Sequence, residues 1–137
     1  MRIKPFSSTF FSGIIVFLFL QGCQKYPENE GISLRSRTER VSNTWKVDNY
    51  KINGNDFTSL VSGYTETFQK DGRFNYAWGI TSGHGSWNFQ NKDQEIRLYG
   101  SDEQSSRTLV IEKLEEKVFW YHYMEGNDKH ELHLVQQ

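Results

Sequence analysis

The sequence contains very little cysteine or proline, with one Cys and two Pro among 137 residues. A single cysteine excludes an internal disulfide, so a folded domain here depends on its own apolar core. An excess of one charge is also lacking, since 16 Lys and Arg stand against 17 Asp and Glu. Without a concentrated basic surface, the composition argues against a nucleic-acid partner. Aromatic residues are plentiful at 15%, enough for a core of bulky rings.

The first 22 residues carry the longest apolar stretch of the chain. Arg2 and Lys4 precede it, and its central part, residues 13–20, is shorter than the roughly 20 residues that span a bilayer. A positive start, a short apolar middle and small residues at a cut site are typical of a secretory signal. Removal of residues 1–22 takes away two basic and no acidic residues, so the net charge falls from −1 to −3.

The single cysteine, Cys23, follows this segment directly in the sequence Leu20-Gln21-Gly22-Cys23. These four residues resemble the bacterial lipobox, whose cysteine is lipidated and becomes the first residue of the mature protein. The resemblance implies a lipoprotein signal at residues 1–22 and a lipid anchor on Cys23. The membrane is then a partner, and the expected location is the bacterial cell envelope, at the outer membrane. Two alternatives stay open: a buried thiol behind an uncleaved anchor, and an ordinary signal cleaved nearby.

Residues 24–40 (QKYPENEGISLRSRTER) have the composition of a flexible tether, with many charges and few aliphatic side chains. Such a segment buries too little apolar surface to offset the entropy lost on ordering. We therefore expect Cys23 and the tether to occupy residues 23–40, and one folded domain to occupy residues 41–137.

From residue 41 onward the pattern is that of β-structure. Apolar and polar residues alternate with period two, and turn residues recur every eight to twelve positions. Lys70-Asp71-Gly72 is a hairpin signal, because glycine accepts a positive φ. A short helical turn is expected within residues 57–61, and a bulge before Leu114. Eight strands are predicted, at residues 44–52, 64–69, 73–79, 83–90, 95–99, 107–114, 117–125 and 130–135.

Eight consecutive antiparallel strands with short loops have two economical arrangements. An up-and-down barrel pairs the last strand with the first and leaves no free edge. A sandwich leaves edges that need charged or kinked protection. The predicted fold is therefore all-β, an eight-stranded antiparallel up-and-down barrel, with the sandwich as the alternative.

Four short motifs occur in order along the predicted domain. They are TWKV at residues 44–47, TFQKDGRF at 67–74, GSWNF at 85–89 and IEKL at 111–114. Together, and placed after a lipobox, they resemble the lipocalin-like domains of small bacterial lipoproteins. The resemblance implies a lipocalin-like eight-stranded barrel. It implies little about activity, because one fold hosts many functions.

The sequence predicts no catalytic, metal or cofactor site. His130 and His133 are three residues apart on a predicted strand and point to opposite faces, and no cluster has the spacing of zinc ligands. Ser86 or Ser106 with a histidine and Asp102 lack a nucleophile elbow. A hydrolase is therefore the weakest hypothesis, and we expect a protein that is not an enzyme.

The leading hypothesis is a binding module for a small apolar or amphipathic ligand. The bulky inward residues favour a filled barrel, but a small barrel can also hold one small ligand at its mouth. The aromatic residues expected to converge there are Tyr64, Tyr76, Trp78 and Tyr99.

The alternative hypothesis is a filled barrel that binds an envelope protein or a glycan. Residues 119–123 (FWYHY) carry large rings on both faces of one strand, so one set must face outward or be covered by residues 57–61. Exposed aromatic residues are good contact residues. The expected partner surface is Trp120, Tyr121 and Tyr123.

Overall fold

The computed structural model describes residues 34–100 and 106–137. The predicted signal segment, Cys23 and Asp102 lie outside the described residues. Within the described part, no helix is both long and apolar enough to cross a membrane.

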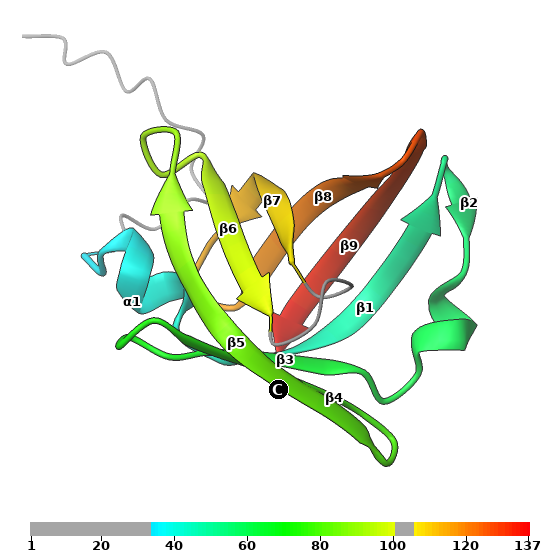
Figure 1. The fold of residues 1–137 in the computed structure, drawn as a ribbon, viewed down its shortest axis with the longest axis horizontal. Coiled ribbons are helices and arrows are strands. Elements are labelled where there is room, and N and C mark those ends of the chain that lie inside the picture. The colour runs from blue at the N-terminus through cyan, green and yellow to red at the C-terminus, as the bar shows by residue number, and fades with distance from the viewer. Residues whose placement is uncertain (1–33, 101–105) are drawn as a thin grey trace, which may run out of the picture. The chain divides into compact units, whose positions relative to one another are not determined.

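The described chain folds into one antiparallel sheet with two short helical segments (Figure 1). The elements are α1 (Arg37–Val41), β1 (Thr44–Ile52), β2 (Asn55–Asp56), the 3₁₀ helix η1 (Thr58–Val61), β3 (Thr65–Phe68), β4 (Arg73–Trp78), β5 (Thr81–Gln90), β6 (Glu95–Gly100), β7 (Arg107–Leu114), β8 (Val118–Glu125) and β9 (Asp128–Gln136). All eight predicted strands and the helical turn are present, with ends that differ by a few residues.

The sheet closes into a barrel because β1 pairs with β3 on one side and with β9 on the other. The β1–β9 register runs from Trp45 opposite Gln136 to Ile52 opposite His130. Eight strands, β1 and β3–β9, therefore form the predicted up-and-down barrel, and the sandwich is excluded. The short β2 pairs only with the end of β1.

The turn between β3 and β4 and the bulge in β7 both occur where the sequence predicts them. The turn between β3 and β4 contains Gly72 at φ 89°, a conformation that a residue with a side chain rarely adopts. The predicted bulge is confirmed by a register shift between Ile111 and Lys113, after which Leu114 is buried.

Helix α1 corrects the tether prediction for residues 37–40. Ser36 and Glu39 form a capping box, in which Glu39 N donates to Ser36 Oγ (3.2 Å) and Ser36 N donates to Glu39 Oε2 (2.9 Å). Arg40 Nη1 donates to Leu114 O at 3.0 Å, and Val41 is fully buried. Reciprocal capping and one buried apolar residue thus order a segment that its charged composition assigned to the tether.

The barrel half beside α1 is filled with aromatic rings. Phe68 lies at its centre, with ring centroids 5.0 to 5.8 Å from those of Phe74, Trp87 and Phe119. Trp45 is fully buried against Phe119, and its Nε1 donates to Val41 O at 2.9 Å. The predicted filled interior is therefore correct for this half.

Candidate functional site

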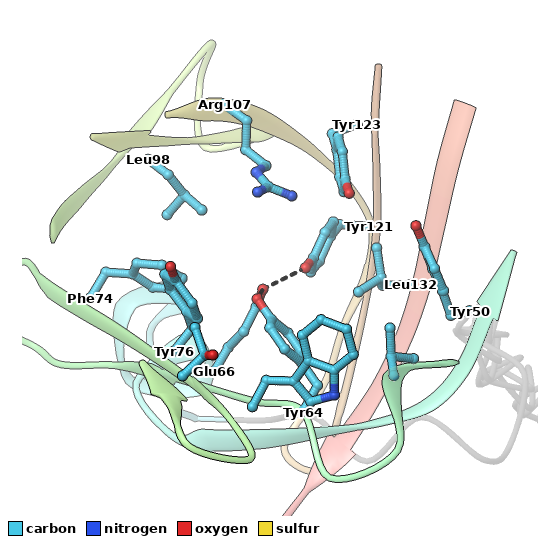
Figure 2. Close-up of a pocket in the computed structure, with 13 residues that line it drawn as sticks. Tyr50, Tyr64, Glu66, Phe74, Tyr76, Leu98, Arg107, Tyr121, Tyr123 and Leu132 are labelled. Carbon is cyan, nitrogen blue, oxygen red and sulfur yellow. Dashed lines mark hydrogen bonds between the residues drawn. The ribbon is translucent and has the colours of Figure 1, made fainter. Parts of the chain in front are cut away.

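The opposite half of the barrel contains a cavity of about 310 Å³ (Figure 2). Every barrel strand contributes at least one lining residue, and seven of the 13 lining residues are aromatic. Its lining residues include Trp78 and Thr81 beside the β4–β5 turn and Tyr123 near the β8–β9 turn. Figure 1 shows these two turns on the side of the barrel away from α1 and the β3–β4 turn. Trp78 is 48% exposed, so its ring marks the rim where the cavity meets solvent.

The most unusual lining residue is Glu66, an acidic side chain that is only 3% exposed. Inward residues of β3 alternate, so Glu66 and Phe68 share the inner face. Glu66 Oε1 accepts hydrogen bonds from Tyr64 OH (2.8 Å) and from Tyr121 OH (2.9 Å; Figure 2). Glu66 Oε2 is buried without a hydrogen-bond partner among the described residues. Buried polar atoms are nearly always hydrogen-bonded, so this exception marks a candidate binding group.

Burial governs the protonation of this cluster. It raises the pKa of Glu66, and the hydrogen bonds from Tyr64 and Tyr121 and the charge of Arg107 offset this rise only in part. Burial, followed by the nearby charge of Glu66, raises the pKa of Tyr64 and of Tyr121. Both phenols therefore keep their protons and act as donors to Glu66.

Arg107 brings a positive charge into the cavity from the start of β7. Figure 2 shows that its guanidinium points into the cavity from the side opposite Glu66. The guanidinium carbon lies 4.4 Å from the centre of the Tyr123 ring. Burial lowers the pKa of Arg107, but Tyr123, Tyr121 and Glu66 raise it more, so the group stays charged.

His130 contacts two of the tyrosines that line the cavity, Tyr50 and Tyr123. Its Nδ1 is hydrogen-bonded to Tyr50 OH at 2.7 Å, and its ring stacks on Tyr123 at 4.7 Å. His133 lies on the outer face against Trp120, so the prediction that the two histidines point to opposite faces is confirmed. Among the residues the structure describes, no three His, Cys, Asp or Glu side chains are grouped to hold a metal ion.

A close approach between two strands places Tyr76 in the cavity wall. Gly83 of β5 lies opposite Tyr76 of β4, and a Cβ at Gly83 would overlap the Tyr76 ring. Glycine at this position therefore makes room for an aromatic side chain that lines the cavity.

Three of the four predicted ligand residues line this cavity: Tyr64, Tyr76 and Trp78. Tyr99 does not, which corrects its expected position. Leu98 of β6 points inward, so the next residue points outward, and Tyr99 is 50% exposed beneath the guanidinium of Arg97.

The three residues of the predicted partner surface do not share a face. Tyr121 is 1% exposed, and both Tyr121 and Tyr123 line the cavity, which corrects their expected outward position. Trp120 lies between the inward Phe119 and Tyr121 in sequence and therefore points outward. Its ring stacks on His133 at 4.1 Å, with Lys113 Nζ 4.8 Å from its centre, so these side chains, rather than η1, cover it.

Sequence reasoning missed Glu66 and Arg107. The alternation of inward and outward residues along each strand could have revealed them. Glu66 is on the same inward face of β3 as Phe68, and Arg107 is on the same inward face of β7 as Leu109. Burying a charged side chain costs folding free energy unless the charge is paired or hydrogen-bonded, so charged residues in inward positions are candidates for a functional site.

Eight antiparallel strands closed around a cavity, with a helix beside one end, define a lipocalin-like fold, as the sequence motifs implied. The fold is similar to that of a lipocalin-like protein from Bacteroides uniformis ATCC 8492, with a TM-score of 0.56, 16% identity and coverage of 72% of this chain and 99% of that chain. It is also similar to a DUF4847 family protein from Bacteroides vulgatus ATCC 8482, with a TM-score of 0.53, 14% identity and coverage of 72% and 94%. No protein-family model matches the chain, and no curated protein matches its sequence.

Proposed function

We propose that this protein is a non-enzymatic binding module that holds one small amphipathic molecule in the barrel cavity. The observation that carries the proposal is the unpartnered Oε2 of Glu66 at the wall of an aromatic cavity. A buried polar atom costs free energy unless it is satisfied, and a ligand group can satisfy it.

The size and lining of the cavity support the same proposal. Ligand pockets have volumes of about 300–1,000 Å³, with mostly apolar walls and a few polar groups that fix orientation. The cavity of about 310 Å³ stands at the lower end of that range. It therefore suits a single small molecule with an apolar ring and one polar end.

Filling the cavity tests the proposal. Val61 of η1 lines the cavity and is only partly buried, so Val61→Trp is expected to occupy the space that a ligand needs. We expect the affinity for N-phenyl-1-naphthylamine, a neutral fluorescent probe, to fall about tenfold or more, a loss of about 1.4 kcal/mol, because the indole ring takes the space that the probe needs. Fluorescence titration measures this affinity, and native mass spectrometry shows any molecule that copurifies.

Val110→Trp is the matched control for this experiment. Val110 follows the buried Leu109 on β7 and pairs with His122, so it faces the outer side. We expect this variant to bind the probe like the wild-type protein. Equal binding by all three proteins would place the probe outside the cavity and contradict the proposal.

We also propose that Cys23 carries the lipid that attaches the protein to the outer membrane of a bacterial envelope. The positive start, the apolar stretch and Gly22 before Cys23 support this assignment. Several acyl chains give durable attachment, because each buried CH₂ contributes about 0.8 kcal/mol.

Cys23→Ser is expected to move the protein out of the membrane fraction or to leave its signal uncleaved. Intact-mass measurement of bacterially produced protein should show the mass of acyl chains on the wild type and on Gln24→Ser, but not on Cys23→Ser. A wild-type protein with an unmodified thiol would contradict the assignment.

A partner bound to the outer surface has less support. Of the three rings expected there, only Trp120 faces outward, and it is already stacked on His133. We therefore favour the cavity as the binding site.

A further inference from the structure

Three large apolar side chains are exposed beside the entrance of the cavity. Trp78 is 48% exposed, Leu60 is 61% exposed and Ile80 is fully exposed. Trp78 lines the cavity, and so does Val61, which follows Leu60 in η1. The helix η1 and the β4–β5 turn therefore both border the entrance, on the side of the barrel away from α1 (Figure 1). We call Leu60, Trp78 and Ile80 the apolar rim.

The two segments that form the apolar rim contain no charged residue. Lys, Arg, Asp and Glu make up 24% of the chain, yet none occurs in residues 57–65, around η1, or in residues 74–91, around the β4–β5 turn. The neighbouring β2 and β8–β9 turn do carry charges, among them Asp56, Glu125 and Asp128. The entrance thus has one apolar side and one charged side.

The β4–β5 turn projects from the barrel. Gly79 and Ile80 form a two-residue loop between the paired residues Trp78 and Thr81. In the described part of the chain, β3 pairs with β4 only as far as Ala77, and β6 pairs with β5 only from Gly85 onward. The tip of this hairpin can therefore meet a surface before the body of the barrel does.

The size and composition of the apolar rim favour a lipid surface over a protein partner. Three side chains of this size expose roughly a few hundred Å², whereas each partner in a stable protein complex buries about 800 Å². Tryptophan is suited to the headgroup level of a membrane, and leucine and isoleucine are suited to the acyl chains below it. The absence of charge removes the main cost of entering lipid.

We propose that the apolar rim docks into the surface of a bilayer of zwitterionic lipids, with Leu60 and Ile80 among the acyl chains and Trp78 at the headgroups. Docking places the cavity entrance against lipid, a source of amphipathic molecules. The proposal does not require a bound ligand, so it can fail or succeed independently of the proposed binding function.

The proposed lipid on Cys23 is compatible with this contact. The ten residues 24–33 span at most about 36 Å. The longest barrel strand, β5, has ten residues and a length of about 33 Å. An anchor on Cys23 therefore leaves enough chain for the apolar rim to reach the same membrane, and it raises the effective concentration of the rim there.

Quenching of tryptophan fluorescence by brominated acyl chains tests the proposal. Trp45 and Trp87 are buried, and Trp120 is stacked on the outer face of β8, so Trp78 is the tryptophan that docking brings to lipid. Residues 1–33 contain no tryptophan, so the signal does not report on the N-terminal segment itself.

The full chain is reconstituted in vesicles of brominated or unbrominated phosphatidylcholine. We expect bromination to lower the emission by up to about a quarter, the share of one tryptophan among four. The quenching should be lost in Trp78→Phe and retained in Trp120→Phe. Unquenched emission from the wild type, or quenching that Trp78→Phe retains, would overturn the proposal.

Ile80→Glu keeps Trp78 as the reporter and places a charge at the tip of the hairpin. Ile80 is fully exposed, so the substitution leaves the core unchanged. We expect the ratio of docked to undocked protein to fall about tenfold or more, because Ile80 no longer enters the acyl chains. Leu34→Glu is the matched control, since Leu34 is 97% exposed and precedes α1. Equal quenching in the wild type and both variants would contradict docking through the rim.

Two further measurements distinguish lipid from other partners. Docking through uncharged side chains should persist at about 1 M salt, and its loss there would indicate attachment through charges and overturn the proposal. Native mass spectrometry in detergent should show monomers for the wild type and for Ile80→Glu. A wild-type dimer that Ile80→Glu dissociates would assign the apolar rim to a second copy of the chain instead of lipid.

Discussion

Trp45→Ala is expected to lower the free energy of unfolding by about 3–5 kcal/mol, the range for removing a large buried aromatic side chain. Trp45 is 0% exposed and packs against Phe119, and its Nε1 donates to Val41 O. The substitution removes this packing. It also leaves Val41 O, at the end of α1, without its hydrogen-bond donor. Urea unfolding, followed by circular dichroism, measures the shift in midpoint at a constant m-value.

Two variants separate the causes of this loss. Trp45→Phe keeps most of the ring volume but has no donor for Val41 O, and we expect it to cost about 1–3 kcal/mol. Trp120→Ala removes the same side chain from the outer face and should cost less than Trp45→Ala. An equal loss from the two alanine variants would contradict the packing of this half of the barrel.

Glu66→Gln is expected to stabilise the protein at alkaline pH. The pKa of Glu66 is raised in the folded protein, so above about pH 4.3, where unfolded Glu ionises, the native state binds more protons than the unfolded state. The stability of the wild type therefore falls as pH rises through the folded pKa, by about 1.4 kcal/mol for each unit of difference between the two pKa values. Glutamine does not titrate and should remove this loss.

Urea unfolding between about pH 4 and about pH 9 measures this effect. We expect Glu66→Gln to match the wild type most closely at the acid end and to exceed it at the alkaline end. Glu112→Gln, an acidic residue exposed on β7, serves as the control. Parallel pH profiles for the wild type and Glu66→Gln would contradict a raised pKa at Glu66.

The barrel was predictable because its determinants are local. Alternating residues set the faces of each strand, and turn residues such as Gly72 set where one strand ends and the next begins. Closure follows from eight strands joined by short loops, since pairing of the first and last strands removes both free edges. Helix α1 was also signalled by Ser36 and Glu39, but the charged composition around them obscured that capping pair.

The cavity could be predicted only in part. Tyr76 and Trp78 have inward positions on β4, and Tyr64, just before β3, has the same alternation as Glu66. Tyr99 follows an inward Leu98 and therefore lies outside. The unfilled volume depends on how rings from different strands tilt past one another. The spare oxygen of Glu66 depends on two hydroxyl groups, one of them 55 residues away in the chain. Neither property can be derived from alternation within one strand.

The rings packed beside α1 fill that half of the described barrel, and the cavity in the other half meets solvent at the rim where Trp78 lies. A molecule held as we propose would therefore enter and leave past this rim, because the filled half of the barrel leaves it no path between the rings. The dissociation rate of such a molecule would then depend on the side chains at this rim, Trp78 and Val61 among them.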